Sequence, residues 1–102
     1  MAKKLDGVIE AVRYTRDGKI DRVRAYVLRG VAYSDRVILD RETLLARIRD
    51  GKQFAVGQRR EFLGGTFHLE RPVRLFGADG EEILTTRDEA SNQDELENAL
   101  AF

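Results

Sequence analysis

The sequence predicts an α+β fold: a curved antiparallel sheet or small β-barrel built of hairpins, with one central helix at about residues 40–50. Three observations favour this fold class. Several short segments rich in β-branched and aromatic residues are separated by glycine-containing turns, which is typical of hairpins. A single stretch in the middle of the chain has the apolar spacing of an amphipathic helix. The length of 102 residues corresponds to one domain.

The central helix carries its own start and stop signals. Asp40 is expected to be the N-cap, because its carboxylate can accept the free N–H groups of the first turn. Gly51 is expected to end the helix in the left-handed conformation. Leu44, Leu45 and Ile48 form one narrow apolar stripe, so we expect this stripe to lie on the sheet.

The first hairpin is predicted from two apolar strands, residues 8–15 and 20–28, joined by Asp17-Gly18 as a two-residue type I′ loop. This loop sets the register of the strands and therefore their two faces. The predicted core face holds small apolar residues: Val8 (paired with Val27), Val12 (paired with Val23), Val23, Ala25 and Val27. The opposite face holds a mostly basic set: Ile9, Ala11, Arg13, Thr15, Ile20, Arg22, Arg24 and Tyr26.

Two further hairpins and several single strands complete the predicted sheet. Glycines that supply positive φ at low cost favour hairpins of residues 59–63 with 66–70 and of residues 73–76 with 82–86. Shorter extended segments are expected at 30–33, 37–39 and 52–57. Residues 1–86 are thus predicted to form the globular domain. Residues 87–102 are predicted to be an acidic tail, either a short helix or disordered, since Asn92 and Glu95 resemble a capping box.

The net charge of zero hides an asymmetry between the two parts of the chain. Residues 1–60 contain 15 Lys and Arg against 8 Asp and Glu, whereas residues 61–102 contain 3 against 10. Such asymmetry indicates electrostatic partners. Either the two parts attract each other within one fold, or one of them binds an outside partner.

The basic face of the first hairpin is the candidate binding site, formed by Arg13, Arg22, Arg24 and Tyr26. Arg13 lies directly opposite Arg22 in the predicted register, and like charges opposed across a ladder are destabilising. The functional interpretation is a site for phosphate or for an acidic partner, with Tyr26 for stacking. The alternative is a solvated face whose arginines pair with Asp and Glu from elsewhere in the chain.

Catalytic, metal and cofactor sites are not expected. The chain has no cysteine, and its one histidine, His68, lacks companions at metal-ligand spacing. No pattern places two carboxylates in a dry pocket, as general acid–base catalysis would need. A run of about 18 apolar residues that could span a bilayer is also missing, so we expect a cytoplasmic protein without membrane contacts.

A partial resemblance accompanies these observations. The order of Arg13, Asp17-Gly18 with Ile20, and a helix ending Ile48-Arg49-Asp50-Gly51-Lys52 is similar to a family of short bacterial domains of unknown function. That family closes with a Leu-x-Thr strand and an Asp-Asn-Leu segment, which Leu84-Thr85-Thr86 and Asp94-Glu95-Leu96 match in part. The resemblance implies a fold pattern and no chemistry.

The first functional hypothesis is a non-enzymatic interaction module whose basic face meets an acidic protein surface or the protein's own C-terminal tail. The alternative is a single-stranded nucleic-acid binder, a common role of small β-barrels. An enzyme of unknown reaction is the third hypothesis.

Overall fold

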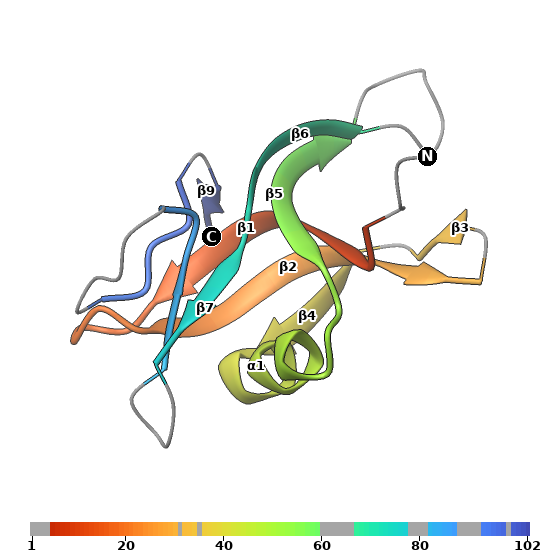
Figure 1. Cartoon of the computed structure of the whole chain (residues 1–102). Coiled ribbons are helices and arrows are strands. Elements are labelled where there is room, and N and C mark those ends of the chain that lie inside the picture. Colours follow the sequence, from red (N-terminus) through yellow and green to blue (C-terminus); the bar gives the residue numbers. More distant parts are fainter. Residues whose placement is uncertain are drawn as a thin grey trace.

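The structure is a computed structural model that describes residues 5–30, 32–34, 36–59, 67–77, 82–87, 93–97 and 99–102. It confirms an α+β domain made mostly of sheet with one helix (Figure 1). The helix is α1 (Arg41–Arg49). The strands are β1 (Gly7–Tyr14), β2 (Ile20–Arg29), β3 (Ala32–Tyr33), β4 (Val37–Asp40), β5 (Phe54–Arg59), β6 (Phe67–Pro72), β7 (Arg74–Phe76), β8 (Ile83–Thr85) and β9 (Leu100–Ala101).

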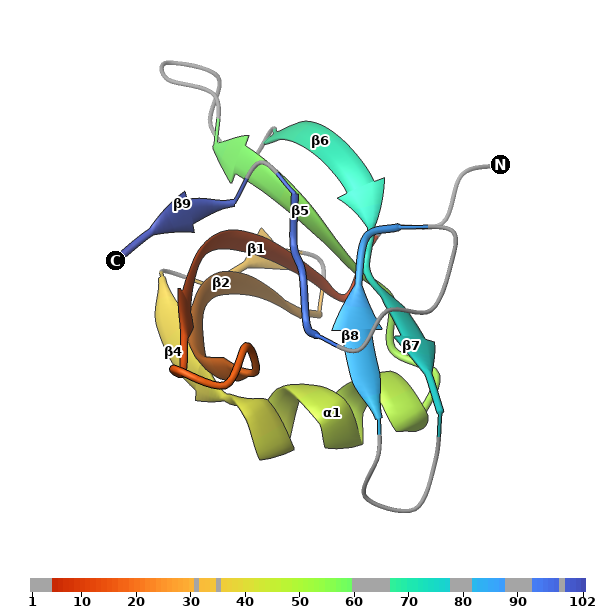
Figure 2. The ribbon, with the colours of Figure 1, turned by 90° about the vertical axis from the view of Figure 1, so that its left-hand side faces the viewer.

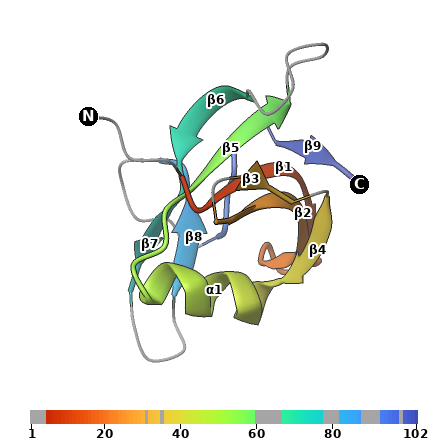
Figure 3. The same ribbon diagram turned by 90° about the vertical axis from the view of Figure 1, so that its right-hand side faces the viewer.

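The main sheet is built around the antiparallel pair β1 and β2. Strands β3 and β4 pair with different parts of β2, while β5 and β9 pair with different parts of β1. The pairs β1–β5 and β1–β9 are parallel, so the sheet is mixed rather than purely antiparallel. Strands β1 and β2 curve above α1, as two opposite views show (Figures 2 and 3). The pairings among the described strands do not close the sheet, so the small-barrel alternative is not confirmed.

The hairpin of residues 73–76 with 82–86 is confirmed at the level of strand pairing, whereas residues 60–63 and 66 of the other predicted hairpin lie outside the described residues. β5 pairs antiparallel with β6, which begins at Phe67, and β7 pairs antiparallel with β8. Gly64 and Gly65, the predicted turn between residues 59–63 and 66–70, also lie outside the described residues. Within the described part of the chain, no helix is long and apolar enough to cross a membrane.

Helix α1 follows its sequence signals. The Asp40 carboxylate accepts a hydrogen bond from the Thr43 N–H at 2.8 Å, which confirms the N-cap. Gly51 has φ +88°, which confirms the left-handed stop. Leu44 and Leu45 are buried in the core and Ile48 packs against it half-buried, so the predicted stripe faces the sheet.

The turn between β1 and β2 has three residues, and the predicted two-residue loop is wrong. The Thr15 N–H donates to the Lys19 carbonyl at 2.7 Å, and the Gly18 N–H donates to the Thr15 carbonyl at 3.2 Å. Residues 16–18 therefore form the loop, with Gly18 in the left-handed region at φ +82°. This is the hydrogen-bond pattern of a type I turn followed by a left-handed glycine, the second common way to close a hairpin.

Two bulges change the predicted faces of this hairpin. The pairs Val12–Val23 and Arg13–Arg22 are confirmed, but Val8 lies opposite Tyr26 instead of Val27. The ladder skips Glu10 on β1 and Asp21 on β2, and each skipped residue inverts the alternation of side chains beyond it. As a result Ile9 and Ile20, expected on the basic face, lie in the core, and Val8 lies on the face opposite to Ile9.

Burial explains the bulge at Asp21. Ile9 is 0% exposed and Ile20 is 2% exposed. Burying a side chain of this size stabilises a fold by roughly 1.5–3 kcal/mol. For Ile20 that gain offsets the ladder hydrogen bonds lost where Asp21 is skipped, whereas at Glu10 the shift only exchanges Ile9 with Val8, which is also 0% exposed.

The left-handed Gly18 supplies a direct test of the corrected turn. Gly18→Val should lower the free energy of unfolding by about 1–3 kcal/mol, because a β-branched residue resists positive φ. Gly18→Asn should cost less, since asparagine tolerates this conformation. Denaturant unfolding of the three proteins measures both effects, and equal stability of wild type and Gly18→Val would contradict the assigned turn.

The described residues beyond residue 92 pack into the domain. Asp94 and Leu96 are buried, and β9 adds to the main sheet beside β1. Thr85 forms a parallel bridge with Glu95, which joins β8 to this segment. None of the described residues in 93–97 and 99–102 is helical, so the predicted short helix does not form there, and Asn92 lies outside the described residues.

Asp94 holds this segment in place. Its carboxylate accepts hydrogen bonds from the Ile20 N–H at 2.7 Å and the Leu84 N–H at 2.9 Å. The Arg41 guanidinium donates to both of its oxygens, at 2.8 and 3.3 Å. One buried side chain therefore connects the first residue of β2, strand β8 and the first residue of α1.

Candidate functional site

The predicted basic residues gather on one face of the four strands β4, β2, β1 and β9. The strand registers place them in two rows across the sheet, Asp40–Arg22–Arg13 and Ile38–Arg24–Ala11–Leu100, with Phe102 following β9 beside Arg13. Side chains in a strand alternate between faces, and the row between these two, Leu39–Val23–Val12, points to the core side. We call the outer set the arginine face: Arg13, Arg22, Arg24, Ile38, Leu100 and Phe102.

The centre of the arginine face is an opposed pair of exposed cations. Arg13 and Arg22 lie directly opposite each other on β1 and β2, as predicted, and both are exposed. Within the described residues, neither forms an ion pair with a carboxylate. Asp40 lies beside Arg22 in register, and its carboxylate accepts a hydrogen bond from the Thr43 N–H. This hydrogen bond is the main cause that lowers the pKa of Asp40, and the positive charge of Arg22 lowers it further.

Apolar side chains flank these cations on both sides. Ile38 on β4 and Leu100 on β9 are each 51% exposed, which is high for large aliphatic residues. They stand at opposite ends of the row that contains Arg24. The arginine face therefore combines positive charge at its centre with apolar contact area at two edges.

Arg24 differs from the other two arginines because it is already paired. Its Nε lies 3.2 Å from a Glu10 carboxylate oxygen, and Arg36 donates to the same oxygen at 2.8 Å. Glu10, the bulged residue of β1, is only 6% exposed. Hydrogen bonding to Glu10 raises the pKa of Arg36 above its ordinary value. This part of the surface is an internal ion-pair cluster, as the solvated-face interpretation expects.

Tyr26 does not supply the predicted stacking surface. The side chain shares the outer side of β2 with Arg24, but it is 1% exposed. The guanidinium carbon of Arg36 lies 5.8 Å from the centre of its ring. The residue is a buried part of the sheet, so a ligand cannot stack on it.

Phe102 is the aromatic residue that does lie on the arginine face. Its ring centre is 5.1 Å from the guanidinium carbon of Arg13 and 5.3 Å from that of Arg24. Arg13 Nε also donates to the Phe102 backbone oxygen at 3.0 Å. The sequence carried no local signal for this contact, because it depends on β9 returning to β1 from the far end of the chain.

The acidic residues expected to bind this face lie elsewhere. Asp94 pairs with Arg41, while Glu95 and Glu97 both pair with Arg87. The C-terminal segment does reach the arginine face, but through the ring and backbone of Phe102 instead of these carboxylates. The other predicted tail carboxylates, Asp88 and Glu89, lie outside the described residues.

The described residues contain no group of three His, Asp or Glu side chains that could hold a metal ion. Comparison with protein families, with curated proteins and with solved structures found no match. The comparisons therefore assign no family, and the resemblance to short bacterial domains stays a prediction.

Proposed function

We propose that this protein is a non-enzymatic interaction module that binds an acidic partner protein through the arginine face. The observation that carries the proposal is the opposed pair Arg13 and Arg22, exposed and without a carboxylate partner in the described structure. Like charges directly opposed across a ladder destabilise a sheet. Carboxylates from a partner would remove this repulsion, which makes the free protein complementary to an anion.

The apolar edges support a protein partner in preference to a simple anion. Ile38 and Leu100 provide aliphatic area on both sides of the cations. Protein interfaces gain most of their affinity from buried apolar anchors, with charge setting specificity and the rate of association. The partner is therefore expected to present acidic residues between apolar ones.

Single-stranded nucleic acid is the second candidate and has less support. Binding of that kind combines a basic groove with exposed aromatic rings on which bases stack. Tyr26 is buried, and the ring of Phe102 is already in contact with Arg13 and Arg24. The exposed arginines alone would provide attraction to phosphates without base stacking.

The test compares an acidic peptide containing leucine and phenylalanine with a random single-stranded DNA of equal net charge. We expect the peptide to bind more tightly, and we expect Arg13→Gln with Arg22→Gln to weaken peptide binding about tenfold, the equivalent of about 1.4 kcal/mol. Ile38→Ser should weaken binding of the peptide but leave binding of the DNA unchanged. Fluorescence anisotropy at two salt concentrations measures these affinities.

The matched control is Arg16→Gln, which removes one exposed positive charge from the β1–β2 turn, outside the paired rows of the arginine face. Its affinity for the peptide should stay within about twofold of wild type. Equal losses in Arg16→Gln and in the Arg22→Gln single variant would show attraction by net charge alone and would contradict the proposal. Tighter binding of DNA than of peptide, with a steep dependence on salt, would favour the nucleic-acid alternative.

A further inference from the structure

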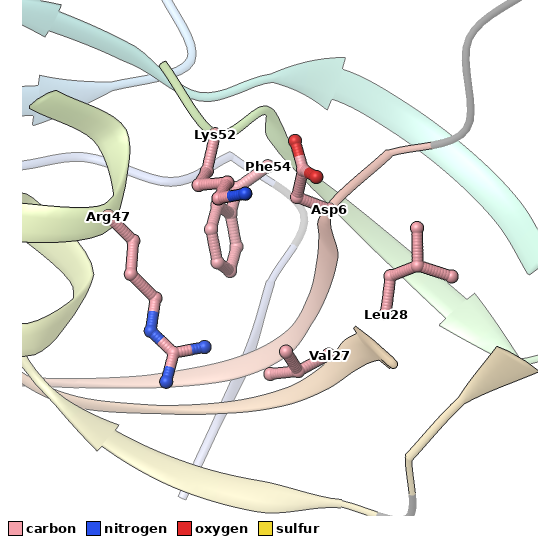
Figure 4. A pocket seen from close by; sticks show the side chains of 6 residues that line it. All are labelled: Asp6, Val27, Leu28, Arg47, Lys52 and Phe54. Atoms are coloured by element: carbon pink, nitrogen blue, oxygen red, sulfur yellow. The ribbon is translucent and has the colours of Figure 1, made fainter. Parts of the chain in front are cut away.

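A separate pocket lies at the opposite end of the β1–β2 pair from the turn. It has a volume of about 140 Å³ and is lined by residues from four elements and their ends (Figure 4): Asp6, Val27, Leu28, Arg47, Lys52 and Phe54. None of them belongs to the arginine face. The pocket is therefore independent of the function proposed above.

The floor of the pocket is formed by apolar side chains of the core. Phe54 is 2% exposed and Val27 is 9% exposed, and both belong to the hydrophobic core. The Phe54 ring lies so close to β1 that a Cβ at Gly7 would be 2.3 Å from it. Only glycine at that position allows the ring to take this place, so the pocket floor is fixed by the fold.

Two cations converge on this floor because of the way α1 ends. The Gly51 N–H donates to the Ile48 carbonyl and the Lys52 N–H donates to the Arg47 carbonyl, both at 3.0 Å. This double hydrogen bond around a left-handed glycine turns the chain back on the last turn of the helix. It places Lys52 beside Arg47, whose side chain extends from α1 toward the Val27 side of the pocket (Figure 4).

The charges of the pocket are unbalanced. Neither Arg47 nor Lys52 forms an ion pair with a carboxylate in the described part of the chain. Asp6 is the one acidic lining residue, and its carboxylate accepts a hydrogen bond from the Gln53 N–H at 2.7 Å. The pocket therefore offers two free cations against one carboxylate that the backbone already holds.

We infer that this pocket binds a small organic anion with an apolar body. A cavity of about 150 Å³ holds one benzene ring, so the volume here fits one ring or a short aliphatic chain. The planar guanidinium of Arg47 can bind a carboxylate or a phosphate through two parallel hydrogen bonds, and Lys52 adds a point charge. The anionic group thus lies between the two cations while the apolar body occupies the rest of the cavity.

Three ligands that share one ring and differ in charge test this inference: benzoate, benzyl alcohol and benzylammonium. Amide chemical shifts in the full-length protein at constant ionic strength give both affinity and location. We expect benzoate to perturb Asp6, Val27, Lys52 and Phe54, and to bind at least fivefold more tightly than the other two compounds. Phenyl phosphate in the same titration distinguishes a preference for phosphate from one for carboxylate.

Variants decide whether the two cations are responsible. Arg47→Gln and Lys52→Gln should each weaken benzoate binding at least fivefold, while Arg16→Gln, which removes the same charge elsewhere, should not. The Arg13→Gln with Arg22→Gln variant should bind benzoate like wild type, which separates this site from the arginine face. Thermal unfolding of each variant checks that it is folded.

Three results would overturn the inference. Equal affinity for benzoate and benzyl alcohol would show an apolar pocket without anion selectivity. Preference for benzylammonium would show that Asp6 dominates the pocket. Shifts spread over the surface, or benzoate binding unchanged in both Arg47→Gln and Lys52→Gln, would show that the anion binds elsewhere.

Discussion

Replacing Asp94 with alanine should lower the free energy of unfolding by about 3–5 kcal/mol, because it leaves the positive charge of Arg41 without its partner. The Asp94 side chain is fully enclosed, and both of its oxygens accept hydrogen bonds. The substitution also leaves the Ile20 and Leu84 N–H groups without acceptors, and each such loss is costly in a buried site. Urea unfolding of wild type and variant measures the difference.

Asp94→Asn should lower the free energy of unfolding somewhat less than Asp94→Ala does, but it should still be clearly destabilising. All four hydrogen bonds to Asp94 are donated to it, two at each oxygen, so an amide group would turn its own N–H donors toward other donors. Glu97→Gln is the control, since Glu97 pairs with Arg87 at a partly exposed site and should change stability by less than about 1 kcal/mol. A loss at Asp94 as small as that at Glu97 would contradict the anchoring role of this carboxylate.

The stability that Asp94 provides should depend on pH. Burial raises the pKa of this carboxyl, but hydrogen bonds from Arg41, Ile20 and Leu84 outweigh burial and lower the pKa below its ordinary value. In the unfolded chain this carboxyl has its ordinary pKa of about 3.9, and at pH values above that the charged form stabilises the folded state. This contribution is lost as the pH falls through the lower pKa of the folded state. The stability difference between wild type and Asp94→Asn should be constant near neutral pH and should shrink below about pH 4.

Leu44→Ala should destabilise the protein by about 2–5 kcal/mol through lost burial and the cavity left behind. Leu44 is 0% exposed and connects α1 to the core of the curved sheet. Ala46→Ser, at an exposed position of the same helix, should stay within about 0.5 kcal/mol of wild type. Denaturant midpoints of the three proteins test this, and a Leu44→Ala effect no larger than that of Ala46→Ser would show that α1 does not cover the core.

The part of the candidate site that lies on the β1–β2 hairpin could be predicted from the sequence, because the pairing of these neighbouring strands determines it. Arg13, Arg22 and Arg24 share one face because the ladder near Val12 and Val23 follows simple alternation from strand to strand. The burial of Tyr26 could not be predicted in this way. Arg36 lies over its ring and pairs with Glu10, and the bulge that presents Glu10 carries no sequence pattern of its own.

The pocket beside Arg47 and Lys52 illustrates the same limit. The end of α1 at Gly51 followed from the sequence, since a glycine after an amphipathic stretch is a local signal. That Phe54 forms the floor depends on β5 pairing with β1 at Gly7, forty-seven positions away in the chain. Nothing near Gly7 in the sequence indicates which aromatic ring will lie against it.

The sequence by itself determined the helix with its caps, the pairing of β1 with β2 near Val12 and Val23, the β7–β8 hairpin and part of the apolar core. These features depend on interactions between residues close in the chain, where side-chain periodicity and glycine positions have direct energetic consequences. The tertiary structure alone decided the parallel pairing of β5 and β9 with β1, the two bulges and the anchoring of residue 94 beside residue 41. In each case, burial and ion pairing between distant segments stabilise the fold by more than is lost where the regular alternation of a strand is interrupted. These contacts form only when the whole chain has folded, so a local sequence pattern does not indicate them.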